Sequence, residues 1–414
     1  MSDAINRPLL DVDLTLGDRG NGHGLPSAFA ELLSQVRRHL HRNPEVGFEE
    51  HRTYAYIRAV LESHGLEVRG PLAGTGLSVD VEGASPGPTI AYRADIDALP
   101  IQDAKNAPYA SQVPGVAHLC GHDAHTALAV GVALLLHHNR ERLNGRVRVF
   151  FQPNEEGMPS GAGLMIDEGV LEDVEAIYAV HVDPTLEVGQ YGLLAGPITA
   201  STDQFTVRID GGSTGHSARP QEATDTIWVA SLVMNALYQL IGRMTDVRNP
   251  SVLTICRIRG GDAYNVIPRD VEFGGTMRST SPEERGRLIE LVQHVADDTA
   301  RTYGAKALVE IQRGSPPVIN DARLVADAEE VIREVFGDGA IYHVPRPSMG
   351  AEDFAHYVER VPGMLLRVGT YSDERTAHPL HDAHFDIDER SLAPTAFLMA
   401  KLLLHYARRR PLSQ

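Results

Sequence analysis

The sequence has few cysteines and a deficit of basic residues. Only Cys120 and Cys256 occur in 414 residues, too few for a disulfide framework, so we expect a reducing compartment and a cytoplasmic protein. Against 55 Asp and Glu stand 38 Lys and Arg, which gives a formal net charge of −17. Nucleic acid and acidic membrane surfaces both attract basic proteins. The charge therefore predicts neither as a partner.

Long apolar runs and several common enzyme motifs are also missing. The longest apolar run, Ala127 to Leu136, is too short to cross a membrane, and the first 25 residues contain no apolar signal segment. The motifs HExxH, GxGxxG and GxxxxGK do not occur. Thermolysin-type proteases, dinucleotide enzymes and P-loop enzymes therefore have no support. The 43% of hydrophobic residues is enough for real cores, and the length predicts two or three domains.

Most of the chain has the pattern of an α/β domain. After an arm of residues 1–25, short apolar runs alternate with segments of helical periodicity. Such alternation is typical of a mostly parallel sheet flanked by helices. We assign residues 26–198 and 313–414 to this domain. Its predicted helices are 28–66 with a break at Asn43 and Pro44, 124–138, 322–336 and 391–408, and its predicted strands are 89–93, 147–152, 176–180 and 364–368.

Residues 199–312 have a different pattern. Strands are predicted at 205–210, 252–258, 271–277 and 307–312, and helices at 224–241 and 282–303. Ser281 and Glu284 make a capping box for the second helix, with Pro282 at its first position. The order βαββαβ predicts a ferredoxin-like α+β domain inserted into the α/β domain.

Acidic residues and a histidine follow three of the predicted strands. Asp95 and Asp97 follow the first, Glu155 and Glu156 the second, and His181 the third. Because the carboxyl ends of parallel strands share one crevice, we expect these residues to converge. Glu155 and Glu156 repel each other, so their loop is either fully solvated or compensated by a cation. In the second case one carboxylate can bind metal while the other acts as a general base.

Two histidine-rich segments offer further metal ligands. HLCGHDAH contains His118, Cys120, His122, Asp123 and His125, which are ligand types of zinc, manganese and similar ions. Its alternative interpretation is a helix-capping Asp with surface histidines. HPLHDAHF places His378, His381 and His384 three residues apart, and alone it is more typical of a solvated turn.

Taken in order, the motifs resemble those of a known family. They are RRHLHRNPEVGFEEHRT, YRADIDALPI, HLCGHDAHTAL, FQPNEEG, HVDP, GHSARP, NVIPRDVEFGGTMRS, PSMGAEDFA and LHDAHFDIDE, spread over about residues 35 to 405. The set resembles the M20 metallopeptidase family. Within it, the match is to the amidohydrolase branch that contains hippurate hydrolases, aminoacylases and auxin conjugate hydrolases.

The resemblance implies a site and a set of roles. Two divalent ions (manganese, zinc, cobalt or nickel) would be held by Cys120, His122, Glu156, His181 and His381. Glu155 would be the general base, and Asp97 would orient a ligand. From residues 199–312, acting as a lid and dimerisation domain, His216 would polarise the scissile carbonyl, and Asn265 and Arg278 would bind the substrate. The alternative interpretation of Arg278, which the resemblance disfavours, is a residue that only decorates the domain surface.

The implied activity is hydrolysis of N-acyl amino acids by a homodimer or higher homo-oligomer. A dipeptidase or carboxypeptidase with the same metals is the alternative, and a metal-binding module without activity is disfavoured because the base and ligands are retained. Three departures from the family pattern concern substrate preference. Gln221 replaces a His after Pro220, Asn154 replaces an Ala before the Glu pair, and the following glycine-rich run reads GMPSGAG.

Overall fold

The computed structural model describes residues 25–409, so the expected arm of residues 1–25 lies outside the described part apart from Leu25. Contacts divide the chain into two compact units. Unit 1 contains the described residues up to Gly196, with 319–345 and 356–409, and unit 2 contains 197–318 and 346–355. The division into domains made from the sequence stays a prediction. It had placed residues 346–355 with the α/β domain, whereas their contacts lie with unit 2.

Unit 1 is built on an eight-stranded mixed sheet in the order β1-β2-β4-β3-β5-β16-β6-β15. The central pairs β4–β3, β3–β5 and β5–β16 are parallel, as is β6–β15. The α/β fold class predicted from the sequence is therefore confirmed. The strands are β1 (Val68–Leu72), β2 (Gly76–Glu82), β3 (Ser85–Asp95), β4 (Asn144–Gln152), β5 (Val174–Glu187), β6 (Tyr191–Leu193), β15 (Ile341–His343) and β16 (Gly363–Tyr371).

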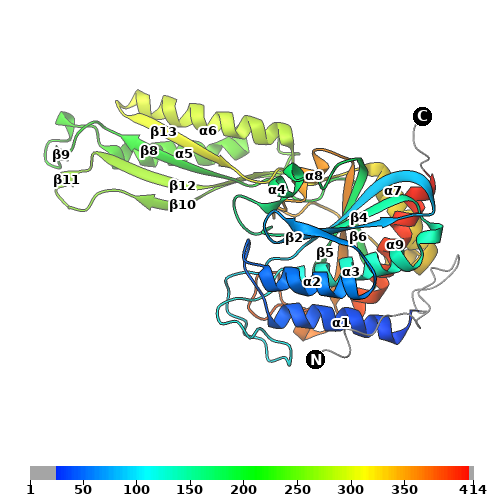
Figure 1. Ribbon diagram of the computed structural model, residues 1–414. Helices are drawn as coiled ribbons and strands as arrows, with labels where there is room; N and C mark the ends of the chain where they lie inside the picture. Colours follow the sequence, from blue (N-terminus) through cyan, green and yellow to red (C-terminus); the bar gives the residue numbers. More distant parts are fainter. Residues whose placement is uncertain (1–24, 410–414) are drawn as a thin grey trace. The chain divides into compact units, whose positions relative to one another are not determined.

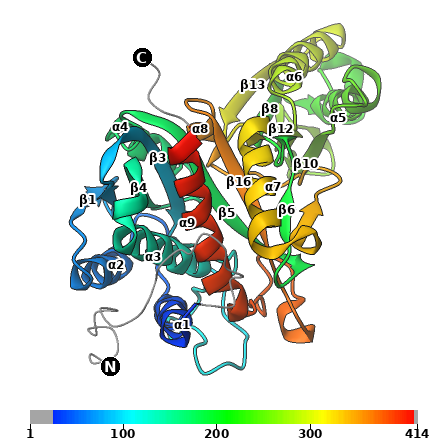
Figure 2. The same ribbon diagram turned by 90° about the vertical axis from the view of Figure 1, so that its right-hand side faces the viewer.

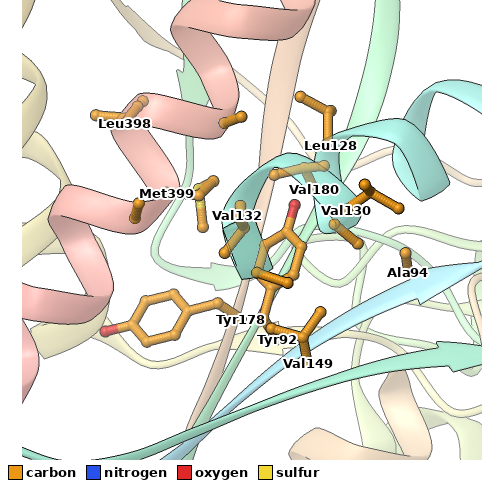
Figure 3. Packing of buried hydrophobic residues seen from close by; sticks show 14 of the residues in the cluster. Tyr92, Ala94, Leu128, Val130, Val132, Val149, Tyr178, Val180, Leu398 and Met399 are labelled. Carbon is orange, nitrogen blue, oxygen red and sulfur yellow. The ribbon is translucent and has the colours of Figure 1, made fainter. Parts of the chain in front are cut away.

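Apolar helices pack on this sheet and form the core with it. Figure 2 shows α3 and α9 running beside the central strands, and Figure 3 shows Leu128 and Val132 of α3 near Leu398 and Met399 of α9 and Tyr92 of the sheet. Nearly every residue of α3 is buried, which explains its apolar sequence. The helices are α1 (Ser27–Arg42), α2 (His51–Ser63), α3 (His122–His138), α4 (Gly161–Asp167), α7 (Ala322–Phe336), α8 (Ala355–Val358) and α9 (Leu392–Arg409).

Two element ends differ from the sequence prediction in ways that affect the site. The strand expected to end at Val180 continues to Glu187, so His181 lies inside β5 rather than after it. The helix expected from Ala124 begins at His122, because Gly121 takes a left-handed conformation with φ +88° immediately before it. The β1–β2 hairpin and the short strands β6 and β15 had not been assigned.

Unit 2 is a four-stranded antiparallel sheet with two helices on one face. The sheet order is β10-β12-β8-β13, and α5 and α6 pack against it over a separate apolar core (Figure 1). This is the ferredoxin-like βαββαβ unit that the sequence predicts. Its elements are β8 (Asp203–Asp210), α5 (Thr226–Arg243), β10 (Ser251–Arg259), β12 (Asp270–Ser279), α6 (Pro282–Thr302) and β13 (Lys306–Arg313), with β9 (Gly215–His216) and β11 (Val266–Ile267) as a small additional pair. The predicted capping Ser281 accepts the Glu284 N–H at the start of α6.

Two-residue strands β7 (Gly196–Pro197) and β14 (Ile319–Asn320) complete the described elements of regular strand. None of the helices among residues 25–409 combines the length and the apolar character that a membrane crossing requires.

Candidate metal centre

Three overlapping groups of potential metal ligands meet at the carboxyl ends of the central strands of unit 1. They are Cys120, His122 and His181; Cys120, Glu156 and His381; and His122, Glu155 and Glu156, with all donor atoms of each group within 4.8 Å of one another. These residues come from the turn before α3, the start of α3, β5, the loop after β4 and the turn before α9. The structure thus brings together the five residues that the family resemblance implies as ligands.

Hydrogen bonds fix which nitrogen of each buried histidine is available. The His122 Nδ1 lies 3.0 Å from the Asp97 carbonyl oxygen and 3.1 Å from Asp97 Oδ1, so it carries the proton and donates. The His181 Nδ1 likewise donates to the Val182 carbonyl at 2.8 Å. Both Nε2 atoms are therefore left as lone-pair donors, which is how neutral histidines bind metals.

Asp97 serves both ends of the cluster. While one of its oxygens accepts from His122, its Oδ2 accepts the backbone N–H of Glu156 at 3.0 Å. A single buried carboxylate therefore sets the ring of one candidate ligand and the backbone of another. Its placement agrees with the orienting role that the family resemblance implies.

His125 and Asp95 look like ligands in the sequence but have structural partners. His125 Nε2 accepts the Val182 N–H at 3.0 Å, so its Nδ1 holds the proton and donates to Asp95 Oδ1 at 2.7 Å. Asp95 also accepts from Arg93 Nη1 at 2.7 Å. These residues hold α3 against β3 and β5, and their polar atoms are used for those contacts rather than for binding an ion.

Gly121 allows the Cys120–His122 turn to approach β5. A Cβ at this position would lie 2.3 Å from Val182 Cγ2, and its φ of +88° disfavours other residues. A glycine here therefore lets Cys120 and His122 approach the residue after His181.

Hydrogen bonds to buried Glu50 and to Pro159 fix the loop that carries Glu155 and Glu156. Buried Glu50 accepts the Asn154 N–H at 3.0 Å and the Thr75 hydroxyl at 2.5 Å. Asn154 has φ +50°, a left-handed conformation that Asn tolerates better than most residues, and its side chain donates to the Pro159 carbonyl at 2.7 Å. The Asn that departs from the family pattern is thus a local turn residue. Glu155 Oε2 lies 4.0 Å from His122 Nε2.

The sequence analysis did not assign a buried ionic network behind the centre. Arg37 of α1 is fully buried and donates to Asp123 at 2.8 Å and to Asp386 at 2.8 Å, and His41 Nδ1 lies 2.7 Å from Asp123. Burial opposes the charge of Arg37, but Asp123 and Asp386 raise its pKa further. The network ties α1 to the first turn of α3. The charged residues inside the motif RRHLH were its only signal in the sequence.

In unit 2 the structure brings His216 and Asn265 together but not Arg278. His216 pairs with Val266 in the β9–β11 ladder, and the Ser217 N–H donates to the Asn265 carbonyl at 3.1 Å. Arg278 lies near the other end of β12 and donates to the Met349 carbonyl at 2.9 Å. From Asp270 to Arg278 β12 spans eight residue steps, which is about 26 Å.

The chemistry of the cluster fits metal ions. His122 Nε2 and Glu156 Oε1 are both buried without a hydrogen-bond partner, and Glu156 Oε1 lies 3.1 Å from His381 Nε2. Burial, with a contribution from Glu156, raises the pKa of the Cys120 thiol to about 12, so a thiolate there needs a cation. Cys120 Sγ and His181 Nε2 lie 3.6 Å apart, the separation of two ligands on one tetrahedral ion, about 3.6 Å.

The fold and this cluster define a metal-dependent hydrolase with a separate α+β unit. The model of the peptidase family M20/M25/M40 matches residues 91–405, and the chain belongs to that family. It is 42% identical over 377 residues to a probable hydrolase, sll0100, of Synechocystis, covering 91% of this chain and 94% of that protein. It is 36% identical over 395 residues to the N-acetyl-L-cysteine deacetylase of Bacillus subtilis, covering 94% and 92%.

A solved structure supports the same assignment. The YxeP protein of Bacillus subtilis, described as a dinuclear metal-binding peptidase of the M20 family, superimposes with a TM-score of 0.83 at 35% identity. The match covers 93% of this chain and 99% of that one. The chain is a hydrolase of the M20 family, and its overlapping ligand groups support a pair of divalent ions.

Proposed function

We propose that this protein hydrolyses the amide bond of N-acyl amino acids, giving a carboxylic acid and a free amino acid. The observation that carries the proposal is the position of Glu155, whose Oε2 lies 4.0 Å from His122 Nε2, while the next residue, Glu156, also groups with Cys120 and His381. The relative named for N-acetyl-L-cysteine deacetylation supports the substrate class.

Each residue of unit 1 has a distinct task in this proposal. Two divalent ions, when bound by Cys120, His122, Glu156, His181 and His381, would supply an activated water and polarise the scissile carbonyl. Glu155 accepts the proton of the attacking water and returns it to the leaving amine. Asp97 keeps the His122 ring and the Glu156 backbone in place throughout.

We propose manganese, zinc, cobalt or nickel as the metal, and a cytoplasmic location.

His216 is suited to stabilise the developing oxyanion. Its Nδ1 accepts the Ala218 N–H at 3.1 Å, so in the neutral ring the proton resides on Nε2. The side chain is exposed, and Nε2 can therefore donate to a carbonyl oxygen. Asn265, beside it in the same loop pair, would add a second polar contact to the substrate.

The span of unit 2 bears on oligomeric state. His216 pairs with Val266, before the start of β12, whereas Arg278 lies near the end of that strand. The stretch of β12 between them is about 26 Å long, so one small substrate cannot touch both residues of a single chain. If both act on the same substrate, one of them is contributed by a second copy. We therefore propose a homodimer in which the two residues of one site come from different subunits.

A substrate panel tests the function. Purified protein, stripped by exhaustive chelation and reloaded with manganese, cobalt, nickel or zinc, would be assayed on N-acetyl, N-benzoyl and indole-acetyl amino acids and on dipeptides. We expect no hydrolysis by the verified metal-free protein, recovery to different extents with the four metals, and preference for acyl amino acids. Preference for dipeptides would support a peptidase instead, and activity without metal would overturn the proposal.

A further inference from the structure

The turn that carries His381 contains a second group of ligand-type side chains. Asp382 donates its N–H to the Pro379 carbonyl at 3.2 Å, and Phe385 donates to the Asp382 carbonyl at 2.9 Å, so two tight turns follow each other. His381 contacts Glu156. His378, Asp382 and His384 form a separate group, the 378–384 triad, with all donor atoms within 4.8 Å of one another.

The distances in the 378–384 triad suit one ion. Asp382 Oδ1 lies 3.2 Å from His384 Nδ1 and 3.7 Å from His378 Nδ1, and the two imidazole rings are 5.3 Å apart. Two ligands bound to one tetrahedral zinc at about 2.0–2.1 Å lie about 3.4 Å from each other. The observed separations bracket that value, so small side-chain rotations would complete the geometry.

The backbone that presents the 378–384 triad is anchored on both sides. The His381 N–H donates to the Leu119 carbonyl at 2.8 Å, the Ala104 N–H donates to the Ala383 carbonyl at 3.0 Å, and Phe385 is fully buried. A fixed backbone lowers the entropy lost when side chains close on an ion. The side chains of His378, Asp382 and His384 are 40%, 38% and 55% exposed, which leaves access for an ion and room for a water ligand.

A simple Asp–His ion pair does not explain the arrangement as well. An exposed Asp–His ion pair contributes little to stability, and such a pair would need only one of the two histidines. Here two imidazoles lie within 3.7 Å of the same carboxylate oxygen, which also accepts the His384 N–H at 2.8 Å.

We propose that His378, Asp382 and His384 bind a third divalent transition-metal ion, of the zinc class, outside the two-metal centre. Imidazole nitrogens with one carboxylate are the ligand set that zinc, nickel and copper accept. The site lies on the same turn as His381, a candidate ligand with a left-handed φ of +67°. An ion bound there would fix the turn.

Metal stoichiometry tests the site without reference to activity. Protein loaded with its two tight ions would be dialysed against increasing zinc alone and its bound zinc counted. We expect a third, weaker equivalent in the wild type, and its loss in the His378→Ala/His384→Ala variant with the two tight ions kept. His51→Ala removes a more exposed histidine, 70% accessible, beside the carboxylate of Glu49, and serves as the control for binding by surface histidines.

Each outcome is decisive. A third equivalent that survives the double substitution, or that falls as much in His51→Ala, would show general binding by surface histidines and overturn the proposal. A second measurement uses Asp382→Asn, which alters the chain minimally, with cobalt in place of zinc. We expect the absorption spectrum of cobalt bound at the weak site to be present in the wild type and lost in this variant. A wild-type protein that binds no third equivalent of zinc would also overturn the proposal.

Discussion

Glu155 and Glu156 are neighbours in the chain but have different surroundings. Glu156 shares a ligand group with Cys120 and His381, and its N–H is held by Asp97. Glu155 groups instead with His122 and Glu156, and its Oε2 lies 4.0 Å from His122 Nε2. Adjacent residues with the same side chain are therefore a natural test of whether position alone divides a metal ligand from a base.

We expect Glu155→Gln and Glu156→Gln to fail in different ways. Glu155→Gln keeps the shape but removes the base, so kcat should fall by about 100-fold or more with the metal content unchanged. Glu156→Gln should lower the metal content, because an amide is a poorer ligand than a carboxylate. Turnover and metal analysis of dialysed samples separate the two effects. Identical behaviour of the variants would contradict the division of roles.

Arg278 gives a second prediction at the same scale. Its guanidinium is steadied by the Met349 carbonyl and offers a planar fork for a substrate carboxylate. Arg278→Ala should lower kcat/KM for a free-acid substrate by about 10- to 100-fold, the value of a charged hydrogen bond. The matched ester or amide should lose much less. Equal losses for both substrates would show that Arg278 does not bind the carboxylate.

At the level of elements, the junction of α3 with β5 depends on one glycine. Gly121→Ala should destabilise the protein and lower its metal content, because the new Cβ meets Val182 next to His181. Gly189 has φ +90° with no atom within 4 Å of an added Cβ, so Gly189→Ala carries only the backbone strain, about 1–2 kcal/mol. Urea unfolding and metal analysis would compare the two. A Val182→Ala change should partly rescue Gly121→Ala but not Gly189→Ala.

The β2–β4 pairing should contribute a pH-dependent stability. Burial raises the pKa of Asp80, but hydrogen bonds from Arg148 at 2.8 and 2.9 Å, with Arg146, outweigh it and leave the pKa below its ordinary value. A depressed folded pKa stabilises the protein above the unfolded pKa, near 4, and this contribution is lost as the pH falls through the folded pKa.

Asp80→Asn should therefore cost about 1–2 kcal/mol of unfolding free energy at pH 7 and progressively less below about pH 4. Chemical denaturation at several pH values measures this. Asp338→Asn is the control, because that carboxylate is 82% exposed in its pair with Arg333 and should show little effect. A penalty for Asp80→Asn that stays constant down to pH 2 would contradict the assignment.

Local signals in the sequence predicted many elements, and long-range contacts explain the others. The predicted helix 322–336 matches α7, and the predicted cap Ser281 marks the start of α6, because both depend on neighbouring residues. The other half of the predicted capping box does not form, since the Glu284 side chain accepts from Arg287 instead. β5 ran past its predicted end because its parallel partner β16 continues beside it, with Pro184 placed where that ladder is irregular. His125 was indistinguishable from a ligand until its two partners, Asp95 and Val182, were located.

For the whole molecule, mixing two inactive variants tests where His216 acts. In a dimer of His216→Ala with Glu155→Gln, exchange of His216 between subunits would leave one intact site, and about a quarter of wild-type activity should return after random reassociation. If His216 serves its own subunit, no activity returns, since every site then carries one defect. Copurification of two differently tagged variants would establish that mixed dimers had formed.

The segment 346–355 has a consequence for protein engineering. In unit 2 the Ala200 N–H donates to the Gly350 carbonyl at 2.9 Å, the Ser348 N–H donates to the Ile198 carbonyl at 2.9 Å, and Arg278 donates to Met349. A chimera that exchanged residues 197–318 between relatives would therefore join foreign strands to a native segment encoded about 30 residues downstream. Unit 2 is therefore encoded by two separate stretches of the chain, 197–318 and 346–355. An exchange of unit 2 between relatives, made to transfer a substrate specificity, has to include both stretches.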